Sequence, residues 1–248
     1  MQISIVGLDI AKQVFQVHAA DAEGRRVAQV RLRRAQVLDF FRELPPCLVG
    51  MEACATAHHW ARELIALGHE VKLMPPAYVK PYVKRNKTDA ADAEAIAEAV
   101  TRPTMRFVAV KSVEQQSMLM LHRVRELFVR QRTMLATALR AHLAEFGIVA
   151  PQGIHRVEKL AAEVRDPAVP PLAQEALSLL VDELASIGRR LDTIEERLVA
   201  LHRADQLSRR LASIPGVGPI TAMAIASTVP DPSVFRSGRE FAAWLGLT

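Results

Sequence analysis

The sequence predicts an α/β protein in which a mixed sheet with flanking helices is followed by a long-helix coiled-coil region and then by an all-α segment. Patterns typical of strands and helices alternate up to Met74. Beyond Pro103 the strand patterns stop, and leucine residues recur at helical spacing instead. From these two observations we predict domains at residues 1–108, 109–206 and 207–248.

Three β-strands open the predicted sheet. Residues 3–9 and 14–19 are mostly apolar, and residues 26–32 alternate polar and apolar side chains at a period of two. The Asp-Ala-Glu-Gly segment at residues 21–24 has the composition of a turn between the second and third strands. The pattern predicts a three-strand antiparallel meander whose first strand ends at Asp9.

A parallel strand pair is predicted next. A helix near residues 36–44 stops at two prolines, and the short apolar strand 47–51 then leads into Glu52. A helix over residues 57–67 connects this strand to another at residues 69–74. Two strands joined by a helix in this order are typical of parallel pairing.

Two long helices are predicted beyond the sheet. The first spans about residues 112–146 and carries several arginines, including Arg123 and Arg130, which either follow a phosphate backbone or lie on a solvated helix flank. A link containing proline and glycine follows over residues 150–171. The second helix has apolar residues spaced alternately three and four apart: Leu177, Leu180, Leu184, Ile187, Leu191, Ile194, Leu198 and Leu201. This repeat predicts either a coiled coil with another chain, giving a homodimer or tetramer, or a helical hairpin within one chain.

The last segment contains a Gly-x-Gly pattern. Gly216 and Gly218 follow an apolar residue and precede a helix rich in small side chains. This pattern is typical of a helix-hairpin-helix motif, which can hold a nucleic-acid phosphate on its unsatisfied backbone N–H groups. A plain helical turn used only for packing explains the glycines equally well.

Composition excludes several classes of protein. No apolar run approaches the roughly 18 residues that a membrane span needs, and the first residues lack the features of a signal peptide. The two cysteines, Cys47 and Cys54, are too few for a disulfide framework and lack the partners of a zinc site. We therefore expect a cytoplasmic protein with reduced cysteines and no membrane contact.

Positive charge is concentrated before one group of acids. The net charge is +5 and the isoelectric point is near 9.5, which favours a polyanionic partner. Residues 71–88 contain no acid and five basic residues: Lys72, Lys80, Lys84, Arg85 and Lys87. We predict that the last four of these contact nucleic acid, because the segment leads directly into Asp89.

Four acidic residues form the predicted catalytic site. Asp9 and Glu52 each end an apolar strand, and Asp89 and Asp92 lie three apart on one face of a predicted helix. Carboxylates that meet at one point repel each other unless a divalent cation lies between them. We predict that all four bind Mg²⁺ in a two-ion site, with Mn²⁺ as the alternative ion. The structural explanation of the helical acids is that Thr88 or Asp89 caps the helix.

The acidic motifs resemble a known family. Residues 6–12 (Val-Gly-Leu-Asp-Ile-Ala-Lys), 51–54 (Met-Glu-Ala-Cys) and 87–93 (Lys-Thr-Asp-Ala-Ala-Asp-Ala) resemble the three motifs of the DEDD insertion-sequence transposases, relatives of the pilin-gene invertases. Residues 214–219 and 241–248 resemble the start of the second domain of that family. The resemblance covers nearly the whole chain.

The resemblance implies a RuvC-like, ribonuclease H-like first domain, a coiled-coil insertion, and a C-terminal domain that supplies a nucleophilic serine. It implies DNA recombination guided by a structured non-coding RNA, in dimers that pair into tetramers, by an enzyme associated with the nucleoid. The family's serine lies shortly beyond the position of Thr248. None of the serines nearby matches its place: Ser213, Ser227, Ser233 and Ser237. We therefore expect a partial C-terminal domain without the nucleophile.

Two other functions fit parts of the sequence. Gly7 and Asp9 before a β-hairpin also resemble the phosphate-binding loop of an actin-like sugar kinase or ATPase, which would bind nucleotide. A non-catalytic coiled-coil scaffold for nucleic acid is the other alternative, and it would show no response to Mg²⁺.

Overall fold

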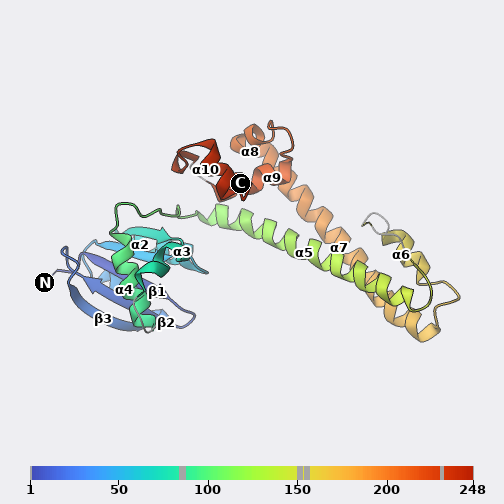
Figure 1. Ribbon diagram of the computed structural model, residues 1–248, viewed down its shortest axis with the longest axis horizontal. Helices are drawn as coiled ribbons and strands as arrows, with labels where there is room; N and C mark the ends of the chain where they lie inside the picture. Colours follow the sequence, from blue (N-terminus) through green and yellow to red (C-terminus); the bar gives the residue numbers. More distant parts are fainter. Residues whose placement is uncertain (1, 84–87, 150–152, 154–156, 230–231, 248) are drawn as a thin grey trace. The chain divides into compact units, whose positions relative to one another are not determined.

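A computed structural model gives the fold. It describes residues 2–83, 88–149, 153, 157–229 and 232–247. The chain divides into two compact units, Met1–Ser112 and Val113–Thr248 (Figure 1). The predicted domain boundaries, at residues 1–108, 109–206 and 207–248, remain predictions.

The first unit is built on one mixed sheet of five strands in the order β3-β2-β1-β4-β5. The strands are β1 (Ile5–Ile10), β2 (Val14–Ala20), β3 (Arg26–Arg33), β4 (Leu48–Glu52) and β5 (Glu70–Met74). Strands β1, β2 and β3 pair antiparallel, and β4 pairs parallel with both β1 and β5. The predicted meander and the predicted parallel pair are therefore both confirmed.

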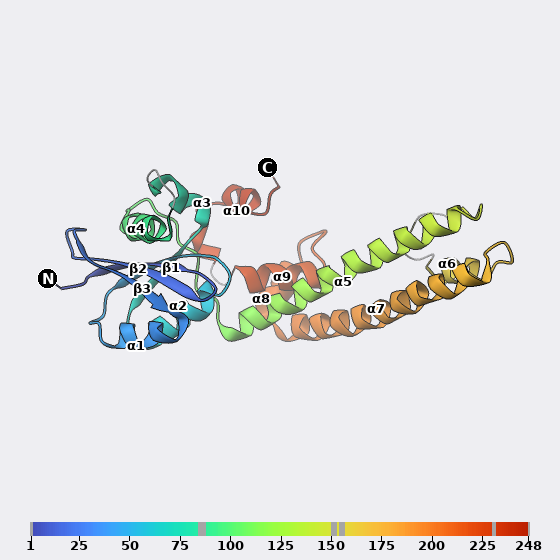
Figure 2. The same cartoon turned by 90° about the horizontal axis from the view of Figure 1, so that it is seen from below.

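Helices cover both faces of this sheet. They are η1 (Arg34–Gln36), α1 (Val37–Arg42), α2 (Ala57–Ala66), α3 (Pro76–Val79), η2 (Lys80–Tyr82) and α4 (Asp89–Val100). Figure 2 shows α1 and α2 on one face and α4 on the other. Helix α4 contacts β1, β2 and β4, so it crosses the middle of the sheet.

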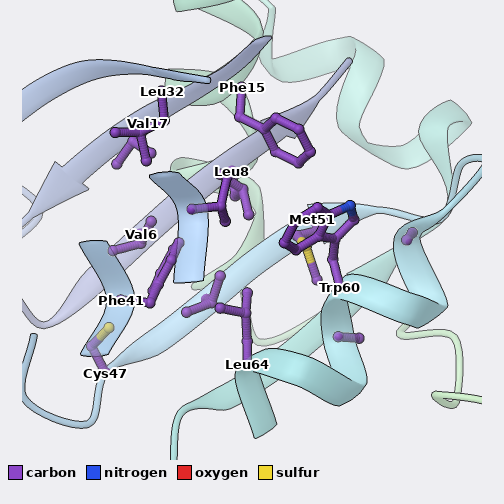
Figure 3. Packing of buried hydrophobic residues seen from close by; sticks show 14 of the residues in the cluster. Val6, Leu8, Phe15, Val17, Leu32, Phe41, Cys47, Met51, Trp60 and Leu64 are labelled. Carbon is purple, nitrogen blue, oxygen red and sulfur yellow. The ribbon is translucent and has the colours of Figure 1, made fainter. Parts of the chain in front are cut away.

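Two apolar cores follow from the alternation of side chains along the strands. Val6, Leu8 and Met51 point toward α1 and α2, where they pack with Phe15 and Trp60 (Figure 3). The last two rings meet edge to face with their centroids 5.0 Å apart. A second cluster lies on the α4 side: Met74, Val79, Ala95, Ile96, Ala99 and Val100. The sheet is therefore buried on both faces at its centre.

The second unit is helical. Its elements are α5 (Val113–Ala144), α6 (Val157–Glu163), α7 (Pro171–Ala204), α8 (Gln206–Leu211), α9 (Pro219–Thr228), η4 (Pro232–Val234) and α10 (Gly238–Trp244). Leu139 and Leu143 near the end of α5 share a core with Leu177 and Leu184 of α7. Helices α5 and α7 therefore pair within the chain, and pairing with another chain remains a prediction.

Polar contacts give the direction of this pairing. Arg125, in the first half of α5, lies 2.6 Å from Glu195 near the end of α7, so the helices run antiparallel. The predicted link between them was incomplete, because α6 lies within it. Leu160 and Val164 from this region are buried against the hairpin, which explains why the segment is ordered as helix.

The Gly-x-Gly segment connects two packed helices. Helix α8 contacts α9, and the turn between them contains Gly216 at a φ of +87°, a value that glycine adopts without strain. Gly218 precedes α9 as its N-cap. The helical turn predicted from sequence is present, whereas phosphate binding by it stays a prediction. Within the described residues, no helix is long and apolar enough to span a bilayer.

Candidate metal centre

The strand register places Asp9 and Glu52 beside each other. Leu8 of β1 lies opposite Met51 of β4 in a parallel pair, so the next residue on each strand is one of these acids. Parallel neighbours in register point to the same face of a sheet, and the strands lie about 4.8 Å apart. Both carboxylates therefore lie at the C-terminal ends of neighbouring strands and on the same face of the sheet.

That face is the one covered by α4. Gly7 lies two residues before Asp9, and Gly50 two residues before Glu52, so each glycine shares a face with its acid. A Cβ atom built on Gly7 would lie 2.1 Å from the Ala93 carbonyl oxygen and 2.5 Å from the Ala97 nitrogen. No real side chain fits these distances, so the glycine allows the backbone of α4 to lie directly on β1.

Gly50 allows a similar approach farther along the helix. A Cβ atom at this position would lie 2.8 Å from the Cβ of Val100. Helix α4 therefore crosses from β1 to β4 with its C-terminal end near Gly50. The contact at Ala93 fixes the other end, so the first turn of α4 lies beside the end of β1.

The first turn of α4 carries the other two acids. Thr88 is the N-cap, and its Oγ1 accepts a hydrogen bond from the Ala91 N–H at 3.2 Å. Of the two predicted caps, Thr88 is therefore the one that the structure has. Asp89 and Asp92 both lie in the first turn, where the positive end of the helix dipole favours a carboxylate. Asp89 is exposed and Asp92 half-buried.

Three of the four acids come together. Asp9, Asp89 and Asp92 each offer one oxygen, and these oxygens all lie within 4.8 Å of one another. Glu52 lies on the neighbouring strand but outside this group. Carboxylate oxygens are hard ligands that suit Mg²⁺, Mn²⁺ or Ca²⁺. The three aspartates therefore fit a divalent cation.

The negative charge of the site acts on the thiol of Cys54. Burial is the main cause that raises the pKa of its thiol, and the carboxylates of Glu52 and Asp9 raise it further. The sequence analysis treated Cys54 only as a reduced cysteine outside any disulfide or zinc site. The Glu-Ala-Cys spacing that follows the strand was the signal for its place beside the acids.

The predicted nucleic-acid contacts are distributed over both units. Lys80 is exposed in η2, whereas Lys84, Arg85 and Lys87 lie outside the described residues. In the second unit, Gly216 and Gly218 are exposed in the turn before α9. Arg123 and Arg130 are exposed on α5, and the latter pairs with Glu126 at 2.9 Å. Nucleic-acid binding by these residues stays a prediction.

Two family models match the chain. Residues 6–148 match one described as "Transposase", and residues 208–248 match one described as "Transposase IS116/IS110/IS902 family". The chain belongs to this transposase family. The first match includes both strand-end acids and the whole of α4. The second begins within α8 and includes the whole of α9 and α10. The resemblance to insertion-sequence transposases is thus confirmed.

Similar transposases come from several bacteria. The chain is 49% identical over its whole length to "Putative transposase y4pF/y4sB" of Sinorhizobium fredii, of which it covers 64%. It is 50% identical over its whole length to "Probable family 20 transposase" of Pseudomonas aeruginosa, of which it covers 74%. It is 39% identical to "Transposase for insertion sequence element IS1328" of Yersinia enterocolitica, with 99% of the chain matching 73% of that protein. The chain therefore spans about two thirds to three quarters of these transposases.

Proposed function

We propose that the first unit is the metal-dependent catalytic domain of a DNA recombinase that cleaves and rejoins strands. The observation that carries this proposal is the meeting of three aspartate oxygens, from Asp9, Asp89 and Asp92, within 4.8 Å. Membership of a transposase family supports DNA as the substrate, and the mixed sheet with flanking helices is consistent with a ribonuclease H-like fold.

Each acid has a distinct place in this proposal. Asp9 would bind metal from the centre of the sheet, and Glu52 from the neighbouring strand. Asp89 and Asp92 would complete the site from the first turn of α4. When bound, Mg²⁺ or Mn²⁺ supplies Lewis-acid stabilisation of the phosphate oxygens and, as two ions, supports both the attacking and the leaving oxygen. The protein's own contribution is to hold the oxygens in place through the contact of α4 with Gly7.

The partners of this activity belong to the same proposal. We propose that DNA and a structured guide RNA bind the protein, and that the active form is a homodimer or tetramer joined through the helical region. The covalent nucleophile would be a serine beyond Thr248, as the family resemblance implies. The protein would act in the cytoplasm, at the nucleoid.

Metal binding by the chain itself tests the proposal. We expect millimolar Mg²⁺ to raise the melting temperature of the wild-type chain and Mn²⁺ to bind with a defined stoichiometry, measured by electron paramagnetic resonance. Asp9→Asn should remove both responses, because it removes the negative charge of one of the three clustered carboxylates and replaces one of its oxygens by an NH2 group. Asp39→Asn is the matched control, because Asp39 is an exposed acid of α1 on the opposite face of the sheet.

The same measurements separate the alternatives. A nucleic-acid scaffold predicts equal melting temperatures with and without Mg²⁺, and a kinase-like protein predicts nucleotide binding in calorimetry. In a longer form that carries the family's serine, Asp9→Asn or Glu52→Gln should abolish DNA cleavage while RNA binding is retained. Cleavage that persists in both variants would refute the assignment of these acids.

A further inference from the structure

An exposed basic row continues from the candidate metal centre across the sheet. Asp9 of β1 lies opposite Gln16 of β2, and Gln16 lies opposite Arg31 of β3. Side chains of directly paired residues point to the same face of the sheet. Arg31 therefore lies on the face that carries Asp9, two strand spacings or about 10 Å away.

Arg33 extends the row along the outermost strand. It lies two residues after Arg31 and shares its face, whereas Leu32 between them is buried in the core on the opposite face. Both arginines are exposed. Lys12, in the turn after β1, is exposed as well. The turn is tied to the end of β3, because the Arg34 N–H donates to the Gln13 carbonyl at 2.9 Å.

The charges of this row are not neutralised locally. Strands β2 and β3 contain no acidic residue. Within the described part of the chain, Lys12, Arg31 and Arg33 form no ion pair. By contrast, Arg25 and Arg42 pair with acids close in sequence. The surface therefore has three exposed cations without acidic partners. The negative charge lies beside them, in the group of aspartates at the candidate metal centre.

We infer that this row, Lys12, Arg31 and Arg33, binds the phosphate backbone of the DNA strand that enters the metal centre. The inference rests on the proposed function. Guanidinium groups bind phosphate oxygens through two parallel hydrogen bonds, and exposed strand residues with a period of two present them on one line. The row begins beside Asp9. A DNA strand whose phosphates are held by the arginines therefore has a neighbouring phosphodiester at the aspartates.

The structural explanation of the same arginines is protection of a sheet edge. β3 is an outermost strand, and charged side chains on such strands prevent pairing with another chain. In that case their loss would change solubility or self-association and leave DNA affinity untouched. The two explanations therefore predict different results for one pair of substitutions.

The test measures binding of a fluorescein-labelled single-stranded DNA by anisotropy, in EDTA, over a series of salt concentrations. Each phosphate contact contributes about 0.7 to the slope of log K against log salt for single strands. Losing two contacts in Arg31→Gln/Arg33→Gln should therefore lower the slope by about 1.4. Arg31→Lys/Arg33→Lys should keep the slope, because charge is retained. Arg42→Gln, on the opposite face, is the single-charge control and should match the wild type.

The outcomes are distinguishable from those of the metal test. An unchanged slope in the double glutamine variant overturns the inference, even if Asp9→Asn loses its Mg²⁺ response as proposed. A reduced slope together with a retained Mg²⁺ response in Asp9→Asn supports the surface and refutes the metal centre. A labelled RNA of the same sequence is measured in parallel, and a loss confined to RNA would overturn the assignment to the DNA strand. Equal melting temperatures of all variants exclude misfolding as the cause.

Discussion

Gly7→Ala should separate α4 from the sheet and thereby dismantle the site. The added Cβ would lie 2.1 Å from the Ala93 carbonyl oxygen, whereas ordinary contacts begin at 3.4 Å. The difference requires a displacement of about 1.3 Å. Because the atoms in the way belong to the backbone, no rotamer change relieves the clash. Overpacking of this kind costs about 1–3 kcal/mol, and a shift of about 1 Å exceeds the tolerance of roughly 0.5 Å for a functional site.

Urea unfolding, followed by Trp60 fluorescence in a Trp244→Phe background, measures the loss of stability. The Mg²⁺-induced rise in melting temperature measures the displacement of the metal site. Gly50→Ala should have a milder effect, because its Cβ meets the Val100 side chain at 2.8 Å rather than backbone. Gly188→Ala, with nothing within 4 Å, should stabilise α7 by up to about 1 kcal/mol. If Gly7→Ala keeps both the wild-type stability and the Mg²⁺ response, the close contact does not position the site.

Two further predictions concern single residues elsewhere. Thr56, in the loop between Glu52 and α2, has a φ of +71°; Thr56→Gly should raise the free energy of unfolding by about 1 kcal/mol, and a lower value in urea titration would contradict this. Burial, and to a smaller extent the charge of Arg125, lowers the pKa of His122 below its usual range. Below about pH 6.5, His122 therefore binds a proton in the unfolded chain more readily than in the folded chain. Stability should therefore fall as pH drops from 7 to 5, and His122→Gln should reduce that fall in urea titrations; an equal fall in both proteins would show that His122 is not responsible.

The strands could be predicted because their patterns report burial directly. Residues 26–32 alternate since one face of β3 packs on the core and the other is exposed, and residues 47–51 are continuously apolar since β4 is covered on both faces. The sequence predicted that Asp9 and Glu52 each end an apolar strand, and the parallel pairing of β1 with β4 places these two strand ends side by side. These features depend on local sequence and on one pairing rule.

Features that depend on distant partners were not predictable. The leucine repeat of α7 indicates an apolar stripe but not which helix covers it, and the structure has α5 of the same chain in that place. Gly7 and Gly50 look like ordinary strand glycines until α4 is known to lie on them. The convergence of Asp89 with Asp9 depends on that contact, so the sequence indicated the chemistry of the acids but not the packing that brings them together.

The packing of α4 also determines what the acids do to stability. Two carboxylate oxygens that lie within 4.8 Å of each other repel by at least about 1 kcal/mol in water and by at least about 3.5 kcal/mol at an effective dielectric constant of about 20. This repulsion acts to push the first turn of α4 away from β1, and the dipole of the helix offsets only part of it. The contact of Gly7 with the backbone of α4 and the apolar cluster around Ile96 hold the helix against that force. A cation bound by the aspartates would convert the repulsion into attraction between the same two elements. Removing one charge, as in Asp92→Asn, should therefore stabilise the metal-free protein while weakening its response to metal, a pair of opposite effects that a purely structural acid would not produce.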